Sequence, residues 1–439
     1  MRADTIFALA SAPGRAGVQV IRLSGPDAGR ALQVLTGRPL PAPRLAVLVG
    51  LRDPVTDELF DKALVLHFAA PASFTGEDVV ELHLHGGRAV LAAATNALTG
   101  LGLRVAEPGE FSRRAFEHGK LDLTEAEAIA DLVDAETAAQ RRQALRQMEG
   151  ALGQLYDGWR HRLTRALAHL EADIDFPEED LPGGLSDAVR PAVEGLVAEL
   201  SAHLADQGRG ERLRDGISIA ILGAPNAGKS SLLNAIARRD VAIVSNQAGT
   251  TRDVIEVQLD LGGYPVLLAD TAGLRDAADQ VESEGIRRAL DRAAKADLKL
   301  LVFDGGELPD PATLALVDED ALLVMNKADL AGAAAPLVGR PILPISARTG
   351  DGVPALLMAL EQAVAARYAP SGAPALTRAR HRSALEECRE DLQRALQAPL
   401  PELAAEDVRL AVRALGRITG RVDVEDLLDV IFRDFCIGK

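Results

Sequence analysis

The chain has 439 residues, 48% of them hydrophobic, which is enough apolar material for more than one folded core. A net charge of −16 excludes a protein that is basic over its whole surface, although a local basic groove for nucleic acid stays compatible with it. Two cysteines, Cys388 and Cys436, cannot build a disulfide framework, and no apolar run is long enough to span a membrane. With no signal peptide, we expect a cytoplasmic protein without a membrane contact.

The first part of the chain mixes strand and helix patterns. "TIFALAS", "GVQVIRL", "KALVLHF" and "VVELHLHGG" are β-branched or alternating and predict strands. "PDAGRALQVLTG" and "RAVLAAATNALTGLG" carry helical spacing and are each closed by glycine. We therefore predict an N-terminal α+β domain over residues 1–118.

The rest of the chain alternates between two sequence patterns, one helical and one mixed α/β. Helical spacing dominates from about residue 121 to 213, apart from "DFPEEDLPGG", and resumes after the linker "APSGAP". Between these stretches lie six strand-like runs, the second and third joined by a tight turn at Gly262 and Gly263. We interpret this order as a mainly parallel α/β domain, 215–370, inserted into an all-helical domain made of 119–214 and 371–439. Three consecutive domains are the alternative.

"GAPNAGKSS" has the spacing of a phosphate-binding loop, and it stands between an apolar strand and a helix, as that loop requires. Glycines let backbone N–H groups wrap phosphates, and the helix N-terminus adds partial positive charge. The lysine would reach the β- and γ-phosphates, and the first serine would bind Mg²⁺. The predicted contacts are Asn226, Ala227, Gly228, Lys229, Ser230 and Ser231.

Three later motifs select the nucleotide. "DTAG" places Asp270 near the Mg²⁺ shell and Gly273 near a γ-phosphate. In "NKAD", the Asp329 carboxylate can accept both N1–H and the exocyclic amine of guanine, donors that adenine lacks. "SAR" adds a backbone N–H for guanine O6. We therefore predict a P-loop GTPase whose base contacts are Asn326, Lys327, Asp329, Ser346, Ala347 and Arg348.

The pattern leaves several candidates for the residues that assist hydrolysis. Leu274 follows "DTAG", where Ras-like proteins have a glutamine, so a carboxylate is expected to orient the water. Asp276, Asp279 and Glu282 are equal candidates by position, and a solvated helix face explains Glu282 as well. The Asn226 oxygen suggests a monovalent cation beside the phosphates, where it would stabilise developing charge.

"PNAGKSSLLN", "AGTTRD", "DTAGLR" and "FCIGK", together with "APGRAGVQVIRLSG", "SFTGEDVVEL", "PGEFSRRAFEHGKLDLTEAEAIADL" and "DIDFPEED", resemble the MnmE (TrmE) family of tRNA-modification GTPases over almost the whole chain. The resemblance implies a potassium-dependent GTPase whose G domains dimerise, with Glu282 orienting water. It places Mg²⁺ at Ser230 and Thr251, and K⁺ at Asn226, Ser245, Gln247 (through its backbone oxygen) and Thr250.

The resemblance also implies a partner and a second ligand. The family acts with the FAD-dependent protein MnmG, so FAD enters only through that partner, and modifies C5 of the wobble uridine of certain tRNAs. The carbon comes from 5,10-methylene-tetrahydrofolate, and 5-formyl-tetrahydrofolate is the related ligand. The N-terminal domain would bind the folate and form a homodimer, with folate contacts at Arg22, Glu81, Lys120 and Lys439.

The final "CIGK" has the spacing of a prenylation box, but lysine is an unusual last residue and no polybasic stretch precedes it. The resemblance instead assigns Cys436 to the modification step, where it attacks the uridine or the folate carbon, or only positions the tail. We expect the tail to fold back towards the N-terminal domain, where Lys439 would lower the pKa of the thiol.

Three alternatives stay open. Glu81, His83 and His85 share one strand face, which suggests either a metal site or a half-polar face beside the folate. Basic clusters at 141–142, 160–162 and 378–382 suggest either tRNA contacts or solvated helix faces. A ribosome-assembly or regulatory GTPase similar to Der or Era, without modification chemistry, would share the G domain. Folate binding would distinguish the two functions.

Overall fold

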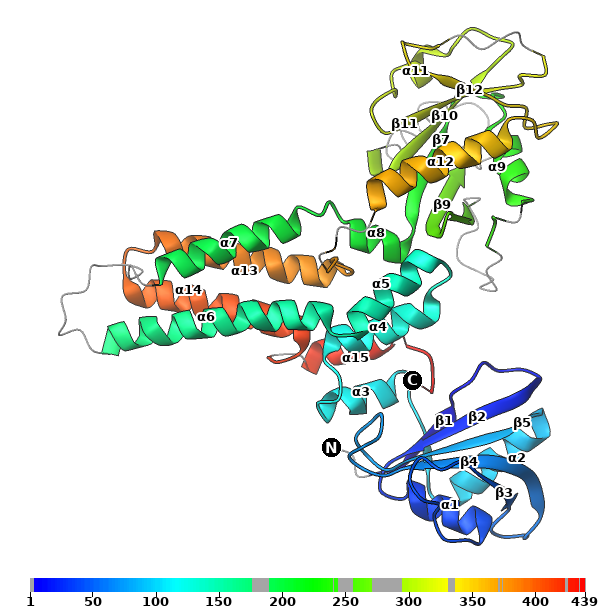
Figure 1. Ribbon diagram of the computed structural model, residues 1–439, viewed down its shortest axis with the longest axis vertical. Coiled ribbons are helices and arrows are strands. Elements are labelled where there is room, and N and C mark those ends of the chain that lie inside the picture. Colours follow the sequence, from blue (N-terminus) through cyan, green and yellow to red (C-terminus); the bar gives the residue numbers. More distant parts are fainter. Residues whose placement is uncertain are drawn as a thin grey trace, which may run out of the picture. The chain divides into compact units, whose positions relative to one another are not determined.

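The computed structural model describes residues 4–175, 189–239, 241–243, 256–270, 294–330, 336–369, 372, 374–422, 425–433 and 435–438. The chain forms two compact units (Figure 1). The first comprises Met1–Ala130, Gln147–Val197 and Ala384–Lys439, and the second comprises Asp131–Arg146 and Ala198–Ser383. The described residues include no helix that is long and apolar enough to cross a bilayer.

The first unit contains a six-stranded sheet in the order β3-β4-β5-β2-β1-β6. All neighbouring strands are antiparallel except β1 and β6, which are parallel. The sequence predicted four of these strands and missed the short strand β6 and the edge strand β3. The strands are β1 (Ile6–Leu9), β2 (Ala16–Ser24), β3 (Val47–Arg52), β4 (Leu59–Phe68), β5 (Val79–Gly86) and β6 (Arg104–Val105).

One face of this sheet is covered by the two predicted helices, α1 (Ala28–Thr36) and α2 (Arg88–Gly100). Alternate residues of β4 and β5 point into the core, where Val65 and Leu82 pack with Leu32 and Leu98 of the helices. The other face carries Arg22 and Glu81, and beside them Ile6 and Ala8 of β1 pack with Phe111 in a smaller apolar cluster.

The same unit contains helices from both ends of the helical segments. They are α3 (Glu110–Glu117), α6 (Ala151–Asp175), α14 (Pro401–Thr419) and α15 (Glu425–Arg433). Helices α6 and α14 lie side by side (Figure 1). They run antiparallel, because Arg409 pairs with Glu171 at 2.9 Å while Arg421 pairs with Asp157 at 3.2 Å. Segments on either side of the α/β region therefore pack together.

The second unit contains a six-stranded sheet in the order β12-β11-β10-β7-β9-β8. All pairs are parallel except the β8–β9 hairpin, which turns at Gly262 and Gly263 as predicted. Its strands coincide with the six predicted runs: β7 (Ile217–Leu222), β8 (Glu256–Leu261), β9 (Tyr264–Asp270), β10 (Leu298–Asp304), β11 (Ala321–Asn326) and β12 (Ile342–Pro344).

Among the described residues, the helices that lie wholly in the second unit are α8 (Arg209–Asp215), α9 (Lys229–Ala237), α11 (Pro311–Leu314) and α12 (Val353–Tyr368). Residues of α9 and α12 share one apolar core with β7, β9 and β10. The remaining helices contain the points at which the two units divide: α4 (Leu123–Asp134), α5 (Ala138–Met148), α7 (Arg190–Leu204) and α13 (Ala379–Gln397). The predicted fold class, an α+β domain with helices and an α/β P-loop domain, is confirmed.

Candidate functional site

The predicted phosphate loop joins β7 to α9, and close packing explains its glycines. A side chain on Gly223 would place its Cβ 2.2 Å from the Val302 carbonyl oxygen of β10. A side chain on Gly228, whose φ is 89°, would lie 2.2 Å from the Asn326 amide nitrogen. Asn226 also has a positive φ of 65°, a conformation that asparagine tolerates better than most residues. The loop is therefore sterically fixed around the first turn of α9.

Lys229 is the first residue of α9 and is only 8% exposed. Its Nζ donates hydrogen bonds of 2.8 Å to the carbonyl oxygens of Gly223 and Ala224, so the ammonium lies inside the curve of the loop. Ser230 and Ser231 follow it in the first helical turn, where the helix dipole places partial positive charge. The Lys229 ammonium, the two serine hydroxyls and the N-terminus of α9 together are suited to binding phosphate.

Asn326 connects the phosphate loop to the base-binding motifs. It is 2% exposed at the end of β11, and its Nδ2 donates to the Ala227 carbonyl at 2.9 Å. Its Oδ1 accepts the Ala347 N–H at 3.0 Å. One buried amide therefore hydrogen-bonds to the "GAPNAGKSS" and "SAR" segments from within "NKAD" and holds the three segments together.

Asp304 is a residue of this region that the sequence analysis missed. It ends β10 and accepts a hydrogen bond from Lys327 Nζ at 2.5 Å. Partial burial raises the pKa of Asp304, but Lys327 and the Gly306 N–H outweigh it and leave the pKa below its usual value. A signal was present, because Asp304 stands at the carboxyl end of a predicted parallel strand, where α/β folds place ligand contacts.

Asp329 is held as a charged acceptor. Hydrogen bonds from the Ser346 hydroxyl and from Arg348, the latter at 2.6 Å, hold its pKa below the usual range. An open pocket of about 620 Å³ lies beside it. Its lining includes Gly228, Ser231, Asn326, Lys327, Asp329, Ser346, Ala347 and Arg348, so residues from three predicted motifs meet in one pocket.

Several predicted residues cannot be placed in this geometry. Ser245, Gln247, Thr250, Thr251, Gly273 and Glu282 lie outside the described residues, as do Asp276 and Asp279. For Asp270 only the backbone is described, at the end of β9 and paired with Ile221 of β7. The structure thus describes the phosphate and base sides of the pocket but not the predicted hydrolytic residues.

A second group of predicted residues lies on the sheet of the first unit. Arg22 of β2 stands directly opposite Glu81 of β5, and its Nε and a terminal nitrogen donate to Glu81 Oε1 at 3.1 and 3.0 Å. The guanidinium carbon lies 5.6 Å from the Phe74 ring centre and 5.9 Å from that of Phe111. Exposed Lys120 lies close to the loop at Gly76. Predicted residue Lys439 is outside the described part.

The two histidines of this strand have different partners. His83 does approach Glu81, at 3.4 Å, but His85 bonds Asp61 at 2.7 Å instead of turning towards them. Among the described residues, no three His, Cys, Asp or Glu side chains gather closely enough to hold a metal ion.

The end of the chain folds back onto the first unit. Ile437 forms an antiparallel bridge with Pro108, and the Gly109 N–H donates to the Cys436 carbonyl at 3.4 Å. Gly438 has a φ of 99°, and a Cβ there would lie 2.2 Å from the Leu9 carbonyl of β1. Cys436 itself is exposed, whereas burial raises the pKa of the Cys388 thiol.

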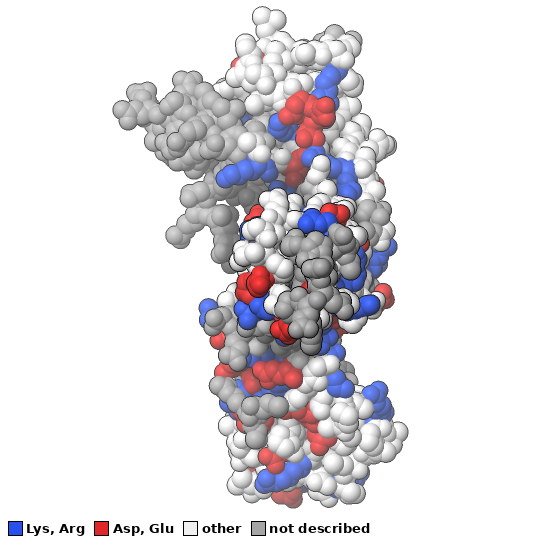
Figure 2. Space-filling view, turned by 90° about the vertical axis from the view of Figure 1, so that its left-hand side faces the viewer, with Lys and Arg blue, Asp and Glu red and all other residues white. Residues whose placement is uncertain are grey.

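The basic clusters have different surroundings. Arg141 and Arg142 are exposed on α5. In the 378–382 cluster, Arg378 pairs with Asp131 at 2.7 Å, and Arg382 pairs with Asp206 at 2.7 Å. Two of its arginines are therefore engaged in internal ion pairs. Figure 2 shows Lys and Arg mixed with Asp and Glu on the face that it draws.

Comparison with known proteins agrees with this geometry. Residues 5–120 match the family described as GTP-binding protein TrmE N-terminus, and residues 123–436 match the MnmE helical domain. The tRNA modification GTPase MnmE of Paramagnetospirillum magneticum is 62% identical over 440 residues, which cover 99% of this chain and 100% of that protein. The chain belongs to the MnmE family of tRNA modification GTPases.

A second relative and a solved structure are also similar to this chain. MnmE of Parvibaculum lavamentivorans is 60% identical, over 99% of this chain and 100% of its own length. Among solved structures, the G domain of the T. maritima FeoB iron transporter is 27% identical and covers 34% of this chain and 98% of that chain, with a TM-score of 0.27. As a member of the MnmE family, the chain is a GTPase that takes part in tRNA modification.

Proposed function

We propose that this MnmE protein is a potassium-activated GTPase of the cytoplasm that works with the FAD-dependent protein MnmG. Together they install a (carboxymethyl)aminomethyl group at C5 of the wobble uridine of certain tRNAs, using a carbon from methylene-tetrahydrofolate. The observation that carries the nucleotide part is the single buried Asn326 amide, which joins the phosphate loop to Ala347 of the guanine side. Because this side chain bonds both segments, we treat phosphate binding and guanine recognition as functions of one site.

Guanine selection rests on the charge of Asp329. The Ser346 hydroxyl and Arg348 keep this carboxylate ionised, so it accepts two N–H groups of guanine. Adenine presents neither donor, so its edge would make no such hydrogen bond to this carboxylate. Guanine should therefore bind more tightly, because hydrogen bonds to charged groups are among the strong ones.

The phosphate loop fits the two proposed cations. The Ser230 hydroxyl, in the first turn of α9, would hold Mg²⁺ together with Thr251, and Mg²⁺ would neutralise phosphate charge. Asn226 offers an amide oxygen, a neutral donor suited to K⁺, and Ser245, Gln247 and Thr250 would complete that shell. Glu282 would orient the attacking water. Lys229, held within the loop, contributes the fixed positive charge on the phosphates.

Salt replacement tests the nucleotide part. We expect GTP hydrolysis to be fast in K⁺ and slow in Na⁺ at equal ionic strength, because the smaller ion fits the oxygen shell poorly. Glu282→Ala is expected to keep GTP binding while losing most turnover. Equal rates in the two salts would exclude the potassium mechanism, and a wild-type rate for Glu282→Ala would remove that residue from the reaction.

The chemistry of the Arg22 site supports folate as its ligand. A pterin carries the same pattern of ring N–H and exocyclic amine as guanine, which a carboxylate such as Glu81 can accept. Folates also carry carboxylates, which suit Arg22 and Lys120. The Phe74 and Phe111 rings beside Arg22 add aromatic surface for a flat ligand. Lys439 completes the proposed contacts, and Cys436 lies on the segment that Gly109 holds.

An exposed apolar pair supports the proposed homodimer. Leu48 of edge strand β3 and Leu64 of β4 are direct cross-strand neighbours, yet they are 66% and 44% exposed. An edge strand with apolar neighbours is a surface that proteins usually cover. Leu48→Glu with Leu64→Glu should shift the sedimentation of the full chain towards the monomer. A dimer that persists unchanged would place the interface elsewhere.

We further propose a division of labour along the chain. Residues 1–118 bind folate and dimerise, 215–370 hydrolyse GTP, and the helical parts 119–214 and 371–439 transmit the G-domain state to the modification site.

Deletion and complementation test the function as a whole. Mass spectrometry of tRNA nucleosides should lose the modified wobble uridine in cells lacking this gene and regain it with the wild-type copy. Calorimetry should detect 5-formyl-tetrahydrofolate binding to the purified protein. An unchanged nucleoside profile together with no folate binding would favour a regulatory GTPase similar to Der or Era.

A further inference from the structure

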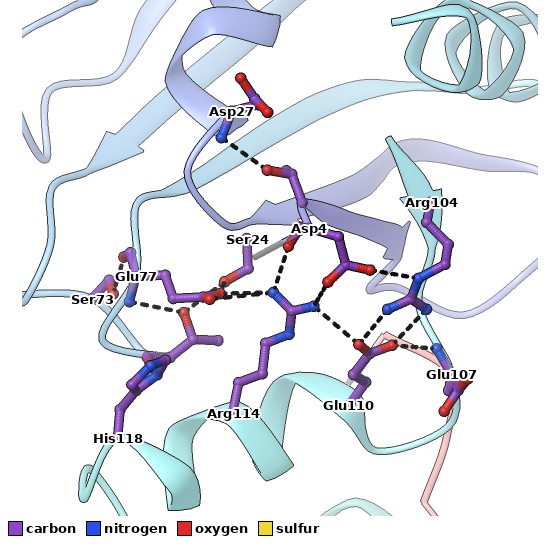
Figure 3. Close-up of polar contacts among 12 residues, drawn as sticks. Asp4, Ser24, Asp27, Ser73, Glu77, Arg104, Glu107, Glu110, Arg114 and His118 are labelled. Atoms are coloured by element: carbon purple, nitrogen blue, oxygen red, sulfur yellow. Dashed lines mark hydrogen bonds and ion pairs between the residues drawn. The ribbon is translucent and has the colours of Figure 1, made fainter. Parts of the chain in front are cut away.

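A network of five charged side chains surrounds the start of α3 (Figure 3). It joins the beginning of β1, strand β6, the loop before β5 and helix α3, which are segments far apart in the sequence. We call it the α3 ion network. Its members are Asp4, Glu77, Arg104, Glu110 and Arg114.

Arg114 is the centre of this network and its side chain is only 7% exposed. Its two terminal nitrogens donate to Asp4, to Glu77 at 3.1 Å and to Glu110 at 3.1 Å. Arg104 reaches two of the same carboxylates, Asp4 at 2.8 Å and Glu110 at 2.6 Å. Two cations therefore hold three carboxylates in a fixed fork geometry.

Stability alone does not explain such a network. Buried ion pairs lose hydration that their mutual attraction only partly restores, and apolar side chains of similar volume often stabilise a core as well or better. A closed set of charge-assisted hydrogen bonds instead fixes the segments that it joins in one defined arrangement. The question is which functional groups these segments carry.

The first segment carries Phe74. Glu77 accepts the Ser24 hydroxyl at 2.7 Å, and Ser24 also bonds Thr75 at 2.6 Å. The Thr75 carbonyl bonds His118 at 2.7 Å, at the end of α3. Thr75, the residue after Phe74, is thus held by hydrogen bonds to Ser24 and His118, and the Phe74 ring is one of the two beside Arg22.

The second segment carries Phe111 and meets the tail. Glu110 accepts the Glu107 N–H at 2.8 Å, which closes the turn containing Pro108 and Gly109. That turn pairs with Ile437 and bonds the Cys436 carbonyl. The residue after Glu110 is Phe111, the other ring beside Arg22. Glu110 therefore supports the ligand site on one side and the tail on the other.

We propose that Arg114 and Glu110 are positioning residues that hold the Cys436 tail and the two aromatic rings of the Arg22 site in one arrangement, so that ligand occupancy of the site changes the accessibility of the Cys436 thiol. The proposal rests on the proposed folate function of that site. It predicts a coupling between two groups that are 414 positions apart in the chain.

Thiol alkylation of the full-length protein tests this coupling. Iodoacetamide labelling of the Cys436 peptide is followed by mass spectrometry with and without saturating 5-formyl-tetrahydrofolate, and buried Cys388 serves as the internal background. In the wild type the folate should slow labelling of Cys436 by about five-fold or more, the lower end of coupling between sites. Arg114→Met should abolish this protection, and Arg114→Lys, which keeps the charge but not the fork, should retain part of it.

A control variant separates positioning from general destabilisation. Arg52→Met removes an exposed arginine of the same unit, whose partner Asp57 lies at 3.5 Å, and should keep full protection. All variants are labelled well below their melting temperatures and at ligand concentrations that saturate each one, so a merely less stable protein would show wild-type protection. Full protection in Arg114→Met, or none in a folate-bound wild type, overturns the proposal.

Failure of the folate function gives a distinguishable result. If the wild type binds no folate, the proposed ligand is wrong, and hydrogen exchange of the Gly109 amide then decides the positioning role. This amide donates to Cys436, and Arg114→Met should accelerate its exchange by about ten-fold relative to the wild type and to Arg52→Met. Exchange at the wild-type rate would show that the network does not hold the tail.

Discussion

The two six-stranded sheets present their site residues in opposite ways. In the parallel sheet, the pocket residues stand in short loops directly after β7, β11 and β12, so each contact belongs to a compact motif. In the unit with the antiparallel sheet, the contacts join residues that are far apart in the sequence. The Arg22 side chain donates to Glu81, and the Gly109 N–H donates to the Cys436 carbonyl. The nucleotide pocket is therefore made of local pieces brought to one sheet edge, whereas the Arg22 site depends on long-range ion pairs.

This difference predicts different responses to mutation. Removing a contact from the nucleotide pocket should change ligand binding with little effect on folding, because backbone geometry carries most of the site. Removing a charge from the α3 ion network should disturb folding and position together, since each charge is the partner of several others. The expected effects below run from the largest to the smallest.

The largest effect is expected for Arg114→Met. Its removal takes from Glu77 the cation that it pairs with and leaves Asp4 and Glu110 with Arg104 alone, which should lower the local free energy of unfolding by about 3–5 kcal/mol. Hydrogen exchange of α3 peptides along a urea series measures this within the first unit. The neighbouring Arg113→Met is the matched control, because Arg113 pairs at the surface with Asp429 and Glu117 and should lose about 0–1 kcal/mol. Equal losses would contradict the comparison.

Asp329→Asn tests the local character of the nucleotide pocket. The amide can still accept one guanine N–H but loses the second charged contact, so GTP affinity should fall about 10–100-fold. Xanthosine triphosphate, which has an oxygen where guanine has the amine, should bind the variant better than the wild type, since the Asn nitrogen can donate to that oxygen. Titration with fluorescent nucleotide analogues measures both affinities. Asp351→Asn, a carboxylate of the following loop that accepts from Thr349, should leave both unchanged.

Much of the nucleotide pocket could be predicted because its signals are local. The motif residues, the strands around them and the turn at Gly262 and Gly263 follow from spacing and strand pattern. The α3 ion network gave no such signal. Asp4 and Arg104 are 100 positions apart, and Glu110 in "PGEF" has the pattern of an ordinary acidic residue in the first turn of a helix. No short-range pattern specifies which distant charges become partners.

For the C-terminal tail, the family resemblance and the structure give different kinds of information. The resemblance assigned Cys436 a role in modification, and we expected the tail to fold back towards the N-terminal domain. The contacts that hold the tail are backbone ones, from Gly109 and Pro108, together with the close approach of Gly438 to Leu9. Backbone contacts of this kind have no side-chain signature, so the sequence could not indicate them.

Gly438→Ala tests that close approach. A Cβ would lie 2.2 Å from the Leu9 carbonyl at a φ of 99°, so the tail should detach at a cost of about 1–3 kcal/mol. tRNA modification should fall several-fold in a complementation assay, while GTP hydrolysis by the purified protein stays at the wild-type rate. Gly37→Ala is the matched control, because Gly37 also has a positive φ, of 63°, but nothing within 4 Å of its Cβ position. A similar loss of modification in both variants would point to backbone strain and not to the tail contact.

Acid should produce the smallest effect. Burial raises the pKa values of Asp4 and Glu110, but Arg104 and Arg114 outweigh it and leave both pKa values below their usual range. Their contribution to folding is therefore complete above about pH 4, where these carboxyls also ionise in the unfolded chain, and is lost as the pH falls through their lowered native values. Exchange of α3 peptides should show declining stability below about pH 4 in the wild type and a shallower decline in Arg114→Met, which has already lost one of these cations. Identical slopes would mean that Arg114 does not set the ionisation of its carboxylate partners, and that the network is less tightly coupled than its geometry indicates.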